Sequence, residues 1–185
     1  MRALNLFLCC CITATASTAL ADIYNGDFEA GGDGWTVDAP AEWAVEFPTE
    51  GGNPGGHALI VAPPHNPGEA CIRQVVACGE GEGSCSVTFQ FGTWQEYRTT
   101  PASREFQIRL YVDDALIYEF MATDRFLWIE RTVDIPCGVH ELAFCFEIND
   151  DPQTWKGIYD NIATRCDDPI PVVQERRTSL KVRFR

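Results

Sequence analysis

The cysteines are the side chains of this 185-residue sequence whose number and spacing most restrict their chemistry. Three of the nine stand together at positions 9–11, and six are distributed over the later part of the chain. A zinc site usually draws its thiolates from closely spaced pairs such as C-x-x-C, and no two of the six later cysteines are that close. Because their number is even, they are expected to form disulfides if the protein is exported. They are Cys71, Cys78, Cys85, Cys137, Cys145 and Cys166.

The usual catalytic motifs are absent from the sequence. It contains no G-x-S-x-G turn, no H-E-x-x-H helix and no glycine-rich phosphate loop. The three histidines, His57, His65 and His140, are scattered through expected loops and turns. Carboxylates that could serve a glycosidase are so numerous that no pair stands out. We therefore expect a protein that is not an enzyme, with a jelly-roll polysaccharide hydrolase or lyase as the less favoured alternative.

The first 21 residues are typical of a secretory signal peptide. Arg2 precedes a short apolar run, and Ala19 and Ala21 supply the small residues of a cleavage site, so cleavage is expected after Ala21. The run is shorter than the roughly 20 apolar residues that span a bilayer, and no later segment approaches that length, so no transmembrane segment is expected. These features predict a secreted protein, extracellular or periplasmic.

The charge of the chain is strongly negative. Its formal net charge is −13, with 27 acidic residues against 14 lysines and arginines. Nucleic-acid binding depends on basic side chains that neutralise phosphates, so a nucleic-acid partner is not expected. Residues 167–185 form a basic tail with five basic and three acidic residues. We expect this tail to be weakly ordered and residues 22–166 to form one folded domain.

The elements that must position any site are strands. In residues 86–91 the apolar side chains of Val87, Phe89 and Phe91 share one face, as in a half-buried strand. The same alternation recurs in the ranges 105–112, 116–120, 130–135 and 141–148. Short strands separated by Gly, Pro and Asp turns, without a helical stretch of comparable length, predict an all-β antiparallel sandwich of the jelly-roll type.

A glycine-rich loop is expected to join two of these strands as a hairpin. Residues 79–84 contain three glycines and separate the segments 75–78 and 85–87. A disulfide between Cys78 and Cys85 would close the base of this loop. The partners of the other four cysteines stay open from the sequence, as does the oligomeric state.

Two motifs near the ends of the predicted domain resemble those of the galactose-binding-like jelly rolls, which include carbohydrate-binding modules of secreted bacterial proteins. The opening motif is Asn25-Gly26-Asp27-Phe28-Glu29, followed by Gly34-Trp35. The closing motif runs from Gly157 to Ile162 and contains Asp160. The strand at 86–91 and the turn at 111–114 fall between them where such domains carry similar features. The resemblance implies the same galactose-binding-like sandwich for this chain.

The resemblance also implies a structural calcium ion, because many members of this fold hold one between their first and last strands. Carried over by position, its ligands would be Asp27, Glu29 and Asp160. Calcium takes six to eight oxygen ligands, so backbone carbonyls from the glycine-rich loop at 49–56 would have to complete the site. The alternative is that these acids cap turns and accept hydrogen bonds from nearby backbone amides.

For a ligand, the resemblance offers the exposed face of one sheet or the loops at one end of the sandwich. Alternation places several polar side chains on the face away from the core, with Trp94 just past a strand end. A sugar ring has an apolar face that packs on aromatic rings and hydroxyls that bind amide and charged groups, so this mixture suits a glycan. The predicted ligand-binding residues are Gln90, Trp94, Gln107, Arg109, Tyr111, Glu147 and Asn149.

Other interpretations of these residues compete with a glycan site. Polar side chains belong on any solvated sheet face, and Trp94 can cover an edge of the core instead. Trp43 and Trp155 are expected in loops, where Trp155 could serve a site at the end of the sandwich. The favoured function is a secreted, non-catalytic domain that binds a glycan or polysaccharide. The alternative is a surface or matrix protein that contacts other proteins.

Overall fold

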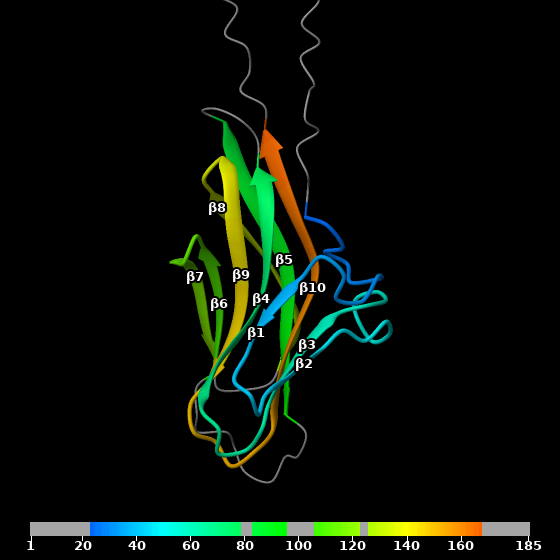
Figure 1. The fold of residues 1–185 in the computed structure, drawn as a ribbon, viewed down its shortest axis with the longest axis vertical. Helices are drawn as coiled ribbons and strands as arrows, with labels where there is room; N and C mark the ends of the chain where they lie inside the picture. The colour runs from blue at the N-terminus through cyan, green and yellow to red at the C-terminus, as the bar shows by residue number, and fades with distance from the viewer. Residues whose placement is uncertain (1–22, 79–82, 96–105, 123–125, 168–185) are drawn as a thin grey trace, which may run out of the picture.

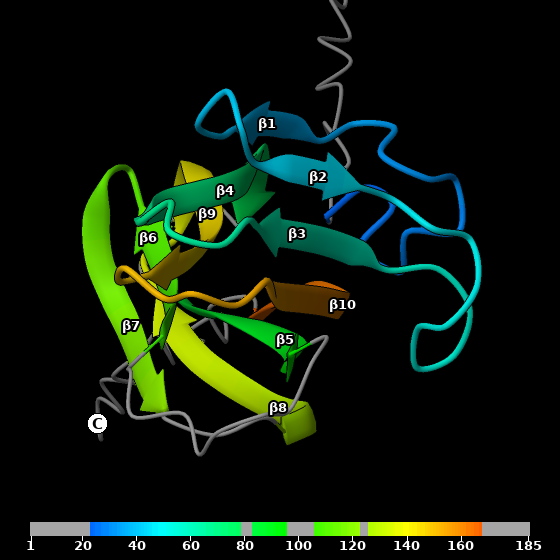
Figure 2. The ribbon, with the colours of Figure 1, turned by 90° about the horizontal axis from the view of Figure 1, so that it is seen from below.

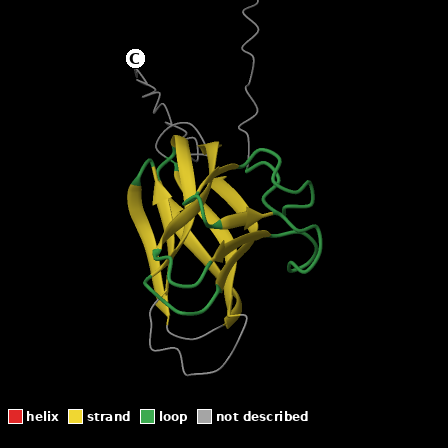
Figure 3. Cartoon of the chain, turned by 60° about the horizontal axis from the view of Figure 1, so that its bottom comes forward, coloured by secondary structure: helices red, strands yellow, loops and turns green. Residues whose placement is uncertain are grey.

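The computed structural model describes residues 23–78, 83–95, 106–122 and 126–167. The predicted signal peptide and nearly all of the predicted tail therefore lie outside the described residues. The described residues form ten strands and no helix, joined by loops (Figure 3). The strands are β1 (Thr36–Asp38), β2 (Ala44–Glu46), β3 (Ala58–Ala62), β4 (Gly68–Cys78), β5 (Ser84–Gln95), β6 (Phe106–Val112), β7 (Ala115–Ala122), β8 (Phe126–Ile135), β9 (Gly138–Ile148) and β10 (Trp155–Asp167).

The strands form two five-stranded antiparallel sheets, which pack as the two layers of a sandwich (Figures 1 and 2). Sheet A has the order β1-β4-β9-β6-β7, and sheet B has the order β2-β3-β10-β5-β8. Most neighbours in a sheet are far apart in the sequence, since β4 pairs with β9 and β10 lies between β3 and β5. Crossing between two antiparallel sheets in this way is the connectivity of a jelly roll. The predicted all-β sandwich is confirmed.

The alternation of apolar residues builds the core between the sheets. In β6, Phe106, Ile108 and Leu110 are fully buried, while the residues between them are partly exposed. Aromatic rings from both sheets meet in the middle, and the rings of Phe89 in β5 and Phe144 in β9 lie 5.3 Å apart between centroids. Burying each such side chain contributes about 1.5–3 kcal/mol, so this layer holds the two sheets together.

Two tryptophans expected in loops belong to this core. The relative exposure of Trp43 is 7%, and that of Trp155 is 1%. Trp155 is the first residue of β10, and its ring lies 5.1 Å from that of Phe106. The interpretation of Trp155 as a residue of an end-of-sandwich site is therefore wrong, because its side chain is covered.

The segment between β2 and β3, residues 47–57, projects from the side of the sandwich (cyan in Figures 1 and 2). It folds back on itself through a bridge between Gly52 and Gly55. Beside it, β10 carries a bulge between Asp160 and Ala163. A bulge changes the direction of side chains along a strand. Here Asp160 accepts a hydrogen bond from the backbone N–H of Asn53, which ties the closing motif to the projecting segment.

Candidate functional site

Polar side chains from four strands converge on one guanidinium on the outer face of sheet A. Arg109 Nη1 lies 3.1 Å from Oε2 of Glu69 in β4, and Nε lies 2.9 Å from Oε1 of Glu119 in β7. Glu147 in β9 also forms an ion pair with Nη1. The group, which we call the Arg109 cluster, consists of Arg109, Glu69, Gln107, Tyr111, Glu119 and Glu147.

Strand register explains why these residues meet. Glu69, Glu147 and Gln107 stand in one row across β4, β9 and β6, and Glu119 stands opposite Arg109. Carboxylates directly opposite one another repel, and the guanidinium offsets that repulsion. The sequence predicted Gln107, Arg109, Tyr111 and Glu147, and the structure brings these four together. The sequence alone did not indicate Glu69 or Glu119, because the only signal for them is the strand order.

Charges in the cluster stabilise the protonated guanidinium. Partial burial alone would lower the pKa of Arg109. The hydrogen bonds to Glu119 and Glu69 and the charge of Glu147 outweigh that effect and raise the pKa. Burial and the charge of Glu69 likewise raise the pKa of Tyr111, so its hydroxyl keeps its proton and donates to Glu69 at 3.2 Å.

A disulfide lies beside the Arg109 cluster on the same face of sheet A. Cys71 of β4 and Cys145 of β9 stand directly opposite each other and are bonded. Both are buried, with Ala143, and the partly buried Tyr111 packs against them. The bond joins the two strands that carry Glu69 and Glu147, so it helps to hold their backbones in register.

The other predicted ligand-binding residues do not share this face. Gln90 and Trp94 lie in β5, which belongs to sheet B. The prediction of one continuous binding face is therefore corrected, because β5 and β6 are neighbours in sequence but not in space. Gln90 accepts hydrogen bonds from Asn53 and Asn161 beside the projecting segment. Asn149 is exposed just after the end of β9, and the side chain of Trp94 lies outside the described residues.

A second arginine on sheet A has a similar environment. Arg73 of β4 forms ion pairs with Glu141 at 2.9 Å, Asp114 at 3.3 Å and Asp38 at 3.4 Å. Its pKa is raised because the hydrogen bonds to Glu141 and Asp114 outweigh the effect of burial. The sequence did not single out Arg73, because its three partners come from separate parts of the chain.

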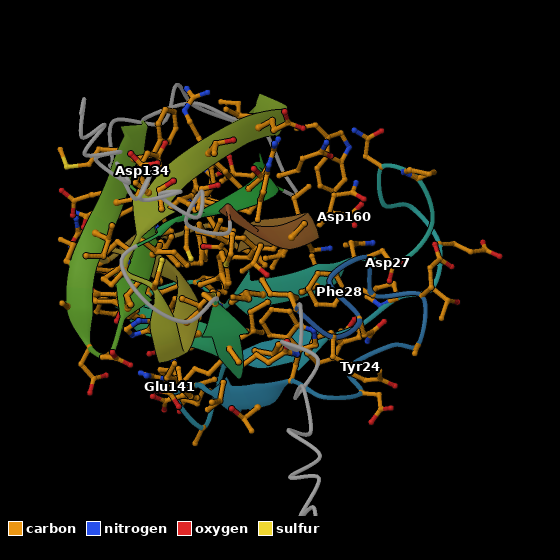
Figure 4. All side chains as sticks on the ribbon, turned by 90° about the horizontal axis from the view of Figure 1, so that it is seen from above. Tyr24, Asp27, Phe28, Asp134, Glu141 and Asp160 are labelled. Carbon is orange, nitrogen blue, oxygen red and sulfur yellow. A yellow bond between two sulfur atoms is a disulfide. The ribbon has the colours of Figure 1, made fainter. Side chains whose placement is uncertain are left out.

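The three acids predicted to bind calcium lie near one another. Asp27 and Asp160 appear on the same side of the sandwich (Figure 4), and the charges of Asp27 and Glu29 both act on Asp160. Asp160 is fully buried, whereas Asp27 and Glu29 are exposed. Burial raises the pKa of Asp160, against the hydrogen bonds from the N–H groups of Asn53 and Asn161.

The contacts of these three acids have features of a calcium site and also of acids that accept hydrogen bonds from backbone amides. Glu29 Oε1 accepts from the N–H of Gly56 at 3.2 Å, and Asp160 accepts from the N–H of Asn53 at 2.5 Å. Backbone amides thus donate hydrogen bonds to two of the acids, which is the arrangement expected if no calcium is bound. Among the described residues, however, no lysine or arginine forms an ion pair with any of the three acids. A buried carboxylate beside two others is an environment that suits a cation.

The predicted Cys78–Cys85 bridge is not formed in this structure. The thiol of Cys85 donates to the carbonyl oxygen of Cys78 at 3.2 Å, and its Sγ atom lies 2.7 Å from Sγ of Cys137. Cys166 stands directly opposite Cys85 in the neighbouring strand. Four cysteines therefore gather at one place, and the pairing among them stays a prediction.

No protein-family model matches this chain, and no curated protein matches it significantly. Solved structures do resemble it. The K1 cleaved adhesin domain of Lys-gingipain from Porphyromonas gingivalis W83 matches with a TM-score of 0.56 at 14% identity, over 80% of this chain and 98% of that chain. TmCBM61 in complex with β-1,4-galactotriose matches with a TM-score of 0.52 at 13% identity, over 78% of this chain and 97% of that one.

A third structure is the CBM22-1 xylan-binding domain of Xyn10C from Paenibacillus barcinonensis. It matches with a TM-score of 0.50 at 14% identity, over 81% of this chain and 95% of that one. The chain has the jelly-roll fold of carbohydrate-binding modules. At these identities the likeness establishes the fold, and function has to be argued from the site. Within the described residues, no helix is long and apolar enough to cross a bilayer.

Proposed function

We propose that this protein is a secreted, non-catalytic domain that binds a glycan through the outer face of sheet A, with the Arg109 cluster as its polar contact. The observation that carries this proposal is the convergence of six polar side chains from four strands on one sheet face. The side chain of Glu119 remains 36% exposed and that of Glu147 26%, but Oε2 of Glu147 is buried, so Glu119 is the carboxylate of the cluster that we expect to reach a ligand.

The chemistry of the cluster suits sugar hydroxyls. Each hydroxyl both donates and accepts hydrogen bonds, and the cluster offers carboxylate oxygens as acceptors and a guanidinium as donor. Because the contacts to Arg109 already hold Glu69 and Glu119 in place, binding costs little additional side-chain entropy. The galactotriose complex of TmCBM61 and the xylan-binding domain CBM22-1 support a glycan as the ligand class.

Substitution of cluster residues tests this proposal. We expect Glu119→Ala to weaken glycan binding at least about 10-fold, since a hydrogen bond to a charged group contributes about 1.5–3 kcal/mol, and Gln107→Ala to weaken it about fivefold, since a neutral hydrogen bond contributes about 0.5–1.5 kcal/mol. The measurement is pull-down on insoluble polysaccharides and a glycan array, followed by calorimetry on the ligand found. Thr88→Ala on the outer face of sheet B is the matched control, because Thr88 bonds Thr132 far from the cluster.

Several results would contradict the proposal. Equal glycan affinity in the cluster variants and the wild type would remove the outer face of sheet A as the site. Loss of binding in Thr88→Ala would place the ligand on sheet B instead. Release of sugar products from a polysaccharide panel would overturn the non-catalytic assignment.

We also propose that Asp27, Glu29 and Asp160 hold a calcium ion that stabilises the domain. The observation in favour is that the fully buried Asp160 has two acids nearby and no ion pair to a basic side chain among the described residues. A bound ion would offset the repulsion among the three carboxylates and join the opening motif to β10. Carbonyl oxygens of the projecting segment would complete its ligand set.

Thermal unfolding with and without calcium tests this second proposal. At 100 times the dissociation constant, a bound ligand stabilises by about 2.7 kcal/mol, which for a domain of this size raises Tm by about 5–10 °C. We expect Glu29→Gln to remove that rise. Asp134→Asn is the matched control, since Asp134 lies on the other side of the sandwich (Figure 4). A Tm that neither calcium nor a chelator changes in the wild type would reject the site.

A further inference from the structure

Four cysteines gather at the end of the sandwich where β4 and β10 finish, at the top of Figure 1. Cys78 is the last residue of β4, and Cys85 is the second residue of β5. Cys137 lies between β8 and β9, and Cys166 is the residue before the last of β10. We call them the strand-end cysteines. The first two are buried and the other two are partly buried against the core, so all four sulfurs lie at the junction of the two sheets.

The contacts among these sulfurs distinguish the possible pairings. Sγ of Cys85 lies 2.7 Å from Sγ of Cys137, a separation that small side-chain rotations convert into a bond of about 2.05 Å. Cys85 meets Cys78 through the carbonyl oxygen of Cys78. Cys166 stands directly opposite Cys85 in the neighbouring strand, and its thiol interacts with both Cys85 and Cys78. Once Cys85 is joined to Cys137, the partner within reach of Cys166 is therefore Cys78.

We propose that the strand-end cysteines form two disulfides, Cys85–Cys137 and Cys78–Cys166. The first joins β5 of sheet B to the connection that leads into β9 of sheet A. The second joins β4 of sheet A to β10 of sheet B. Both bonds cross between the sheets, unlike Cys71–Cys145, which lies within sheet A. They replace the hairpin staple Cys78–Cys85 that the sequence predicted.

Forming these two disulfides requires an electron acceptor, which a protein of the export pathway can supply. Each disulfide forms when two thiols lose two protons and two electrons, and the acceptor is an oxidised dithiol protein whose own disulfide is reduced to two thiols. The predicted signal peptide directs the chain to a compartment where such exchange takes place. No metal or other cofactor is needed for this step.

A zinc ion shared by the four sulfurs fits the geometry less well. A metal site needs at least three ligand atoms close to one another. In the described part of the chain, such a group, with all ligand atoms within 4.8 Å of one another, is formed by Glu69, Cys71 and Cys145, and the strand-end cysteines do not form one. Zinc also requires thiolates. Burial raises the pKa of Cys166, and the hydrogen bond to Cys85 raises the pKa of Cys137, so both sulfurs favour a thiol or a disulfide over a thiolate.

Peptide mapping of the exported full chain tests the pairing directly. Cleavage after Arg, Lys and Glu without reduction separates all six later cysteines, since Glu80 and Glu82 lie between Cys78 and Cys85 and Glu141 lies between Cys137 and Cys145. We expect peptide 83–96 to be linked to 132–141, and peptide 74–80 to 166–175. The link between 70–73 and 142–147 through Cys71 and Cys145 is the internal control.

Other linkages reject the proposal. A link between peptides 74–80 and 83–96 would restore the Cys78–Cys85 staple, and one between 83–96 and 166–175 would show a cross-strand Cys85–Cys166 bond. If all four strand-end cysteines react with an alkylating reagent in the unreduced protein, no bond forms among them. One equivalent of zinc in the native protein would likewise show that the sulfurs bind a metal and not one another. Cys137→Ser adds an independent check, because one thiol per chain should become titratable in the unfolded protein while 74–80 and 166–175 stay linked.

Discussion

At the scale of single residues, the opening and closing motifs contact each other directly. The carbonyl oxygen of Gly26 accepts a hydrogen bond from the N–H of Ile162 at 2.9 Å. A Cβ atom at Gly26 would lie 1.8 Å from the carbonyl oxygen of Ile162, which is a backbone atom and cannot move aside easily. Glycine is therefore required here by close approach of two backbones. The two sequence motifs belong to one local structure.

Alanine at Gly26 should accordingly destabilise the domain. We expect Gly26→Ala to lower the free energy of unfolding by about 3 kcal/mol, because overpacking against backbone costs about 1–3 kcal/mol and occasionally more. Gly31→Ala is the matched control: Gly31 has a φ of +66° and no atom within 4 Å of an added Cβ, so only about 1 kcal/mol of conformational strain applies. Urea unfolding measures both, and equal losses would contradict the argument.

At the scale of elements, a histidine joins the turn between β6 and β7 to strand β9. Nδ1 of His140 lies 2.7 Å from Oδ2 of Asp113, and Oδ1 of Asp113 accepts from the N–H of Glu141. The hydrogen bond to Asp113 raises the pKa of His140. The bond from His140 lowers the pKa of Asp113. The pair is strongest where His140 is protonated and Asp113 is ionised.

This pair gives a pH dependence of known sign. Because the folded pKa of His140 is raised, its stabilisation is fully present below the unfolded value of about 6.5 and is lost as the pH rises through the folded value. Burial lowers the pKa of His57, which acts in the opposite direction. We therefore expect His140→Gln to lose more stability, relative to wild type, at about pH 5.5 than at about pH 8.5. Urea unfolding at both pH values measures this, and equal losses would refute the pair.

At the scale of the whole molecule, net charge selects among glycan classes. The chain carries a formal charge of −13, and on sheet A the arginines Arg73 and Arg109 are each surrounded by three carboxylates. Such a surface repels polyanions over distances up to the screening length, which is about 10 Å at 0.1 M salt. A neutral polysaccharide experiences no such barrier.

We therefore expect the protein to bind neutral polysaccharides and not polyuronates. Affinity for the neutral ligand should change less than about twofold between about 0.05 and 0.5 M salt, because no net charge is brought together on binding. The comparison uses the same pull-down with matched neutral and uronate polymers. Strong binding to a uronate that weakens as salt is added would show that a local basic surface dominates instead.

The strands can be predicted from the sequence because side chains alternate between the two faces of a strand with a period of two. That period predicted β5, β6, β7 and β9 within a few residues, and with the turns it predicted the sandwich. The closing motif was found, but not that it lies within the 13-residue strand β10. The sequence does not predict that Trp155 is buried, because a residue at the end of a strand has no alternating neighbours on both sides and the aromatic rings that cover it come from other strands.

The sequence by itself determined an all-β sandwich, an acidic surface and the inward face of most strands, since each of these depends on composition or on local alternation. Only the tertiary structure decided which strands are neighbours. Strand order places Gln90 and Gln107 in different sheets and brings Glu69 and Glu119 to Arg109. It also places Cys85 beside Cys137, which is distant in the sequence, as well as beside Cys78. The physical reason is that alternation specifies the side of a strand a residue occupies, whereas pairing across a jelly roll depends on contacts between distant segments.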